Sequence, residues 1–126
     1  MVKLNIDVAI LNDHTTLVVV AWDNIVEILK AWAKDHLLCE PVQAEAKAIL
    51  WTLKLVNVEK YNDIIMEGDA KTCFDFLNSK SFGWKVSNVL NNVLKVGISF
   101  HSCTFDWVRR EANGVAHAFG KVFLSS

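Results

Sequence analysis

The residues from Pro41 to Val56 constrain the fold of this chain more than any other stretch. Pro41 is the only proline, and it fits the first turn of a helix, where its missing N–H has no partner to lose. Five apolar residues then recur at helical spacing, namely Val42, Ala46, Ile49, Leu53 and Val56. The stretch is therefore predicted to be an amphipathic helix whose apolar face packs on another layer of structure.

Glu45 lies on the margin of this apolar face, whereas Gln43, Lys47 and Lys54 gather on the solvated side of the helix. A carboxylate in such a position is partly desolvated and requires a cation or a metal ion beside it. Glu45 is therefore the first candidate functional residue. Pairing with a lysine or an arginine is the alternative interpretation.

Three strands are predicted ahead of this helix as an antiparallel meander. Residues 3–10 alternate between apolar and polar side chains, with Asp7 in the middle, where aspartate is disfavoured. Residues 16–22 form a β-branched run, and Asp23-Asn24 is predicted to be a tight turn into a third strand at 25–33. A loop at 34–40 then leads to the helix. For Asp7, the alternative is a solvent-facing charge on an edge strand.

Further strands and helices are predicted after residue 56. Residues 63–67 are a short apolar run of the kind buried on both faces of a sheet, and hence parallel. A helix follows Gly68-Asp69, then a loop at 79–84, a helix at 86–96, a strand at 99–108 and a helix from about Asn113. The element order β-β-β-α-β-α-α-β-α predicts one α/β domain over residues 1–126, with a five-stranded mixed sheet flanked by helices.

Three carboxylates are expected to meet in this arrangement. Ligands of such sheets lie outside the carboxyl ends of parallel strands, where Asp69 is placed, while Asp7 projects from the neighbouring strand and Glu45 from the crossing helix. Converging carboxylates repel one another, and a hard divalent cation removes that penalty. Two such ions about 3.5–4 Å apart activate a water and stabilise the leaving oxygen in phosphodiester cleavage. For Asp69, the alternative is the N-cap of the following helix.

The bulk composition narrows the function classes. A formal net charge of −1 gives no global attraction to nucleic acid or membranes, so any basic binding surface must be local. Three distant cysteines without a Cys-x-x-Cys pattern predict buried free thiols in a reducing compartment. We expect neither a signal peptide nor a transmembrane helix, and therefore an intracellular protein, nuclear or cytoplasmic. A mean hydropathy of +0.26 leaves room for an apolar surface and a homodimer.

Four motifs together resemble one known family. They are Lys3-Leu4-Asn5-Ile6-Asp7, Gln43-Ala44-Glu45-Ala46-Lys47-Ala48, Glu67-Gly68-Asp69-Ala70, and the segment from Trp107 to His117 with its Arg-Arg-Glu-Ala-Asn and Val-Ala-His. In this combination, which covers nearly the whole chain, the sequence resembles the ribonuclease H-like domain of plants, the reverse-transcriptase-like type found in retrotransposon-derived proteins. The last motif is the most specific of the four.

The resemblance implies a ribonuclease H-like fold and an endonuclease that cleaves the RNA strand of RNA–DNA hybrids. It also implies that Asp7, Glu45 and Asp69 are catalytic and hold Mg²⁺ or Mn²⁺. The fourth acidic position of the family falls on His117, as an auxiliary ligand or proton carrier, although histidine binds hard magnesium poorly. A surface or half-buried histidine is the alternative.

Substrate contacts are expected at two places. The loop with Lys80, Trp84 and Lys85 mixes charge and aromatic surface, with tucking of the loop onto the core as the alternative. Near the end of the last strand, Arg109 and Arg110 are positioned to meet phosphates, or instead to pair with Glu111 or Asp106, and Asn113 follows them as a further contact.

Departures from the family pattern support a second function. Val8 stands where the family has a glycine after the first aspartate, and residues 17–20 contain no glycine, so a nucleic-acid backbone finds less room. The alternative is therefore a weak or inactive ribonuclease H-like module that binds nucleic acid or a protein partner. A third possibility is a structural metal-binding domain that binds no nucleic acid.

Overall fold

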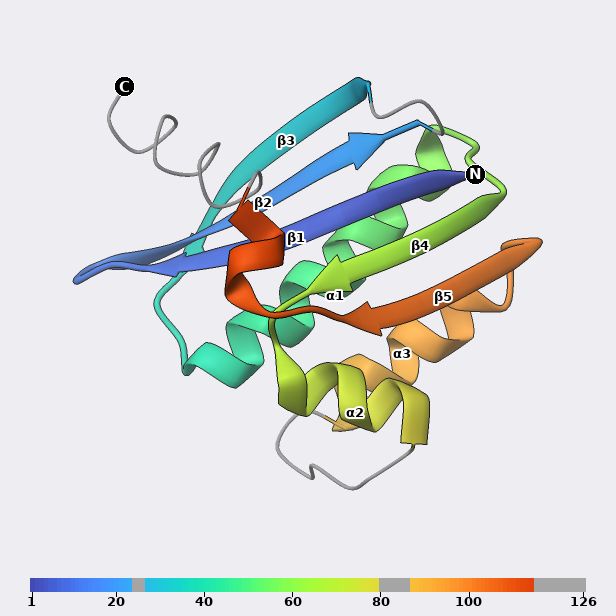
Figure 1. Ribbon diagram of the computed structural model, residues 1–126. Helices are drawn as coiled ribbons and strands as arrows, with labels where there is room; N and C mark the ends of the chain where they lie inside the picture. Colours follow the sequence, from blue (N-terminus) through green and yellow to red (C-terminus); the bar gives the residue numbers. More distant parts are fainter. Residues whose placement is uncertain (24–26, 80–86, 115–126) are drawn as a thin grey trace.

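The computed structural model describes residues 1–23, 27–79 and 87–114 (Figure 1). Five strands form one sheet in the order β3-β2-β1-β4-β5. Their bounds are β1 Val2–Ile10, β2 His14–Trp22, β3 Ile28–Leu37, β4 Asp63–Gly68 and β5 Ser102–Trp107. The helices are α1 Pro41–Val58, α2 Lys71–Ser79 and α3 Ser87–Gly97, with a 3₁₀ helix η1 at Arg110–Asn113.

The sheet is mixed, as the element order predicts. β1 pairs antiparallel with β2, and β2 with β3, whereas β4 runs parallel to both β1 and β5. Figure 1 shows α1 and α3 behind the sheet and η1 in front of it. The carboxyl ends of β1, β4 and β5 therefore lie at one edge, where ligands of such sheets bind.

The main core lies between the sheet and the helices. It joins the rear face of the central strands to the apolar face of α1, and its largest fully buried side chains include Phe74, Leu4, Leu17, Ile49, Leu53, Ile64 and Met66. Cys39, Cys73 and Cys103 are free thiols. The expectation that they are buried holds for Cys73, whereas Cys39 and Cys103 are half-buried. No helix within the described ranges is both long and apolar enough to cross a membrane.

The predicted third strand is wrong at its carboxyl end. Its predicted start at residue 25, like most of the predicted Asp23-Asn24 turn, lies outside the described residues. β3 begins at Ile28, because Asp23 and Glu27 close the connection with hydrogen bonds from the Asp23 N–H to the Glu27 carbonyl and from the Glu27 N–H to Asp23 Oδ1, each 3.0 Å. The strand continues to Leu37 through residues predicted to be a loop. Residues 34–37 pair with β2 through backbone hydrogen bonds. This pairing keeps them in a strand although their polar side chains have a low preference for strands.

The remaining boundaries differ less from the predictions. α1 extends two residues beyond Val56, and β5 begins at Ser102 rather than residue 99. Residues 99 and 100 instead hydrogen-bond back to the end of α3. The final helix predicted from about Asn113 falls largely outside the described residues, which end in η1 and Gly114.

Candidate active site

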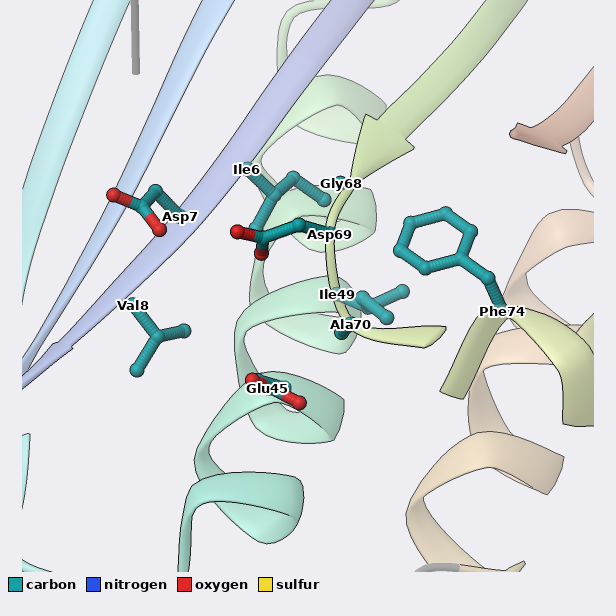
Figure 2. A pocket seen from close by; sticks show the side chains of 9 residues that line it. All are labelled: Ile6, Asp7, Val8, Glu45, Ile49, Gly68, Asp69, Ala70 and Phe74. Atoms are coloured by element: carbon teal, nitrogen blue, oxygen red, sulfur yellow. The ribbon is translucent and has the colours of Figure 1, made fainter. Parts of the chain in front are cut away.

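Two of the predicted acids come from adjacent parallel strands. The register of β1 and β4 sets Ile6 opposite Gly68, so the next residues, Asp7 and Asp69, stand side by side at the carboxyl edge of the sheet. Figure 2 shows their carboxylates on the same hollow. β1 is the central strand of the sheet, and the alternative of an edge-strand charge at Asp7 is therefore wrong.

Glu45 completes the set from α1. It lines the same hollow as Asp7 and Asp69, a space of about 220 Å³ with the adjoining open solvent included. Ile6, Ile49 and Phe74 are among its apolar walls (Figure 2). Three alanines, Ala44, Ala46 and Ala48, are fully buried beside Glu45. Their small side chains let this turn of α1 approach the sheet closely.

The three acids share one electrostatic environment in the hollow. Burial, followed by the charges of Asp69 and Asp7, raises the pKa of Glu45 from 4.5 to about 7. Burial and a like charge both disfavour the ionised carboxylate. Within the described residues Glu45 forms no ion pair with a lysine or an arginine, so the alternative interpretation of Glu45 has no support there.

The backbone at Asp69 is held by groups that the sequence did not reveal. The Trp107 indole N–H donates to the Asp69 carbonyl at 3.3 Å, and the Val108 N–H donates to the Gly68 carbonyl at 2.9 Å. A side chain at Gly68 would place its Cβ 2.9 Å from Cε2 of Phe74. Asp69 lies two residues ahead of α2, so the position next to this helix is Ala70.

A buried amide network lies on the front face of β1, beside Asp7. Asn5 donates from Nδ2 to Glu67 Oε1 and to Asn113 Oδ1, both at 3.1 Å, and Asn113 donates from Nδ2 to the Ile6 carbonyl at 2.6 Å. Asn5 is 6% exposed and Asn113 is 1% exposed. The network attaches η1 to the strand that carries Asp7. Its sequence signal was Asn5, a polar residue in the middle of a central strand.

The predicted substrate contacts are placed differently. Arg109 and Arg110 are exposed, and neither pairs with Asp106 or Glu111 in the part of the chain that the structure describes. The side chain of Asn113 is buried in the amide network, where its amide group already serves Asn5 and Ile6. Four predicted site residues lie outside the described residues: Lys80, Trp84, Lys85 and His117.

The donor set at the hollow suits a hard divalent cation, because carboxylate oxygens are the ligands that magnesium prefers. Among the described residues, however, no three His, Cys, Asp or Glu side chains are close enough together to hold a metal ion. The three acids share the hollow without forming a coordination sphere, and metal binding requires their side chains to move together.

Known structures with the same architecture include ribonucleases H. RNase H1 from the archaeon Halobacterium salinarum NRC-1 superposes with a TM-score of 0.85 at 17% identity, covering 93% of this chain and 92% of that one. LC11-RNase H1 in complex with an RNA/DNA hybrid gives 0.82 at 12% identity, with 94% and 92% covered. The N-terminal RNase H domain of rv2228c from Mycobacterium tuberculosis gives 0.78 at 15% identity, with 91% and 86% covered. The fold is therefore ribonuclease H-like.

Sequence comparison identifies the family. No curated protein matches the chain. The family described as "Reverse transcriptase-like" matches residues 5–122, a range that contains the three acids at the hollow and nearly the whole sheet. The chain therefore belongs to the reverse transcriptase-like family.

Proposed function

We propose that this chain is a divalent-metal-dependent endonuclease of ribonuclease H type, which hydrolyses the RNA strand of RNA–DNA hybrids. The observation that carries the proposal is the meeting of Asp7, Glu45 and Asp69 at one hollow on the carboxyl edge of the sheet. Family membership supports it, as does the likeness to LC11-RNase H1, which was solved with an RNA/DNA hybrid.

The carboxylates of Asp7, Glu45 and Asp69 would hold Mg²⁺ or Mn²⁺. When bound, such ions activate a water and stabilise the leaving oxygen of a phosphodiester. The protein's own contribution is to hold the acids on rigid elements. The register of β1 and β4 positions the two aspartates, and α1 brings in Glu45 with apolar walls that limit water around it. His117 remains the predicted proton carrier or auxiliary ligand.

We assign substrate binding to basic side chains near the carboxyl edge of the sheet. Arg109 and Arg110 follow β5 on the exposed surface, where their guanidinium groups are available to phosphates. Lys80, Trp84 and Lys85 remain predicted contacts. We do not assign Asn113 to the substrate, because its buried amide already makes hydrogen bonds within the protein.

The test is cleavage of an end-labelled RNA–DNA hybrid with Mg²⁺ or Mn²⁺. We expect cleavage of the RNA strand by the wild type and none by Asp69→Asn. Glu27→Gln is the matched control, because it removes an exposed carboxylate next to β3 at the opposite end of the sheet and should retain activity. Folded protein that cleaves nothing at any metal concentration would remove the enzymatic proposal.

A second candidate function is favoured by Val8. Its side chain lines the hollow together with Glu45 and Asp7 (Figure 2), which restricts the approach of a nucleic-acid backbone. A module that binds hybrids without cleaving them fits this observation. Salt-sensitive hybrid binding with no turnover, under conditions where Mg²⁺ stabilises the fold, would favour the module over the enzyme.

A further inference from the structure

A second hollow lies on the opposite flank of α1 from the three carboxylates. It encloses about 670 Å³, open solvent included, between α1 and the rear face of β2 and β3. Lys47, Trp51 and Lys54 stand four and three residues apart and therefore share one side of α1, whereas Glu45 and Ile49 face the carboxylate hollow. The body of α1 thus separates the two sites. We call this second hollow the lysine groove.

Both walls of the lysine groove carry basic residues. Lys47 and Lys54 lie on the α1 wall, about 10 Å apart along the helix axis because each residue rises 1.5 Å. Lys34 and His36 lie on the β3 wall, about 7 Å apart because they are alternate residues of a strand. Within the described ranges none of the three lysines forms an ion pair, although the chain has nearly equal numbers of acids and bases.

Between these walls the lining is apolar and aromatic. Leu17, Leu50 and Val89 line the groove, and the half-buried indole of Trp51 lies beside them. The Lys34 ammonium is 5.9 Å from the centroid of the Trp51 ring. This distance places a cation at the ring face, so a flat group that stacks on Trp51 would also meet positive charge.

We propose that the lysine groove binds a single-stranded segment of nucleic acid. Phosphates would follow the two lysine-bearing walls, and bases would contact Trp51 and the apolar lining, the combination by which single strands are held without sequence preference. A duplex does not suit the groove, because its bases are paired and stacked away from such a surface. The choice of nucleic acid over an acidic peptide rests on the proposed function, whereas the anionic character of the ligand rests on the groove alone.

The experiment measures the fluorescence anisotropy of a labelled oligothymidylate of about ten nucleotides, a length within the usual range for such sites. The titrations contain EDTA, so that the carboxylate hollow holds no divalent ion. We expect Lys47→Gln/Lys54→Gln to weaken binding about tenfold at low salt. The slope of log K against log salt should also become shallower by about 1.4, because each lysine–phosphate contact with a single strand contributes about 0.7 to that slope. Trp51→Ala should also weaken binding.

The matched control is Lys60→Gln/Lys95→Gln, which removes the same charge from exposed positions outside the groove. Equal loss of affinity in both double variants, or no loss in either, would overturn the proposal. Stronger binding of an oligoglutamate peptide than of the oligonucleotide would overturn the ligand class.

The same variants separate this proposal from the proposed function. Asp69→Asn should lose hybrid cleavage but keep oligonucleotide binding, because α1 lies between the two sites. Lys47→Gln/Lys54→Gln should bind the oligonucleotide about tenfold more weakly at low salt but cleave a blunt hybrid normally. If this folded variant no longer cleaves a blunt hybrid, the groove is not a separate site from the carboxylate hollow. If the wild type cleaves nothing, the proposed nuclease activity is refuted, but the proposed binding of single strands is not.

Discussion

Replacing Glu45 by glutamine should stabilise the metal-free protein at alkaline pH. The pKa of Glu45 is about 7 in the folded chain, raised from 4.5 by burial and by the charges of Asp69 and Asp7. Since the fold raises the pKa of an acid, ionisation of Glu45 destabilises the folded state. The penalty is absent below about pH 4.5, grows between about pH 4.5 and 7, and is complete above that range.

The size of the effect follows from the shift. A shift of about 2.5 pH units corresponds to about 3 kcal/mol at 1.36 kcal/mol per unit, and partial solvent access at Glu45 lowers this to roughly 1–3 kcal/mol. Glutamine keeps the shape of the side chain but carries no charge. Glu45→Gln should therefore raise the free energy of unfolding by that amount at about pH 8 and leave it nearly unchanged at about pH 4.

The assay is urea unfolding in EDTA at the two pH values, followed by circular dichroism. Glu27→Gln, an exposed carboxylate at the other end of the sheet, is the control and should not change stability in this pH-dependent way. Added Mg²⁺ should then stabilise the wild type more than Glu45→Gln, because the variant lacks one proposed ligand. If Glu45→Gln and its control behave alike at both pH values, the three carboxylates do not converge in solution.

Three further changes probe the surroundings of the site. Gly68→Ala brings a Cβ to 2.9 Å from the buried Phe74 ring, so we expect a loss of about 1–3 kcal/mol in urea unfolding; an unchanged midpoint would contradict that packing. Asn113→Ala removes the donor to the Ile6 carbonyl and should cost about 1–3 kcal/mol, whereas an Asn113 that only contacts substrate would leave unfolding unchanged. Val8→Gly should increase hybrid cleavage in the kinetic assay while costing roughly 2–3 kcal/mol of stability, because Val8 also packs against the core. Slower cleavage by folded protein would refute steric restriction.

The candidate site could be predicted largely because its three acids sit at informative local positions. Glu45 falls on the margin of a helical apolar face, Asp7 interrupts an alternating strand, and Asp69 follows a short buried strand. The motifs around them resemble a known family. What local pattern could not supply was the charge state of Glu45, which depends on burial and on two carboxylates from other elements.

The sequence by itself determined the order of the strands and helices between Val2 and Trp107, because periodicity of 2.0 or 3.6 is a property of neighbouring residues. Which strand lies at the centre of the sheet was decided by the tertiary structure. Only the tertiary structure decided features that join distant parts of the chain. The strand at 34–37 exists through its pairing with β2, and Asn5 meets Asn113 across a separation of 108 residues. Likewise, the lysines on the solvated side of α1 became one wall of a groove only when β3 supplied the other.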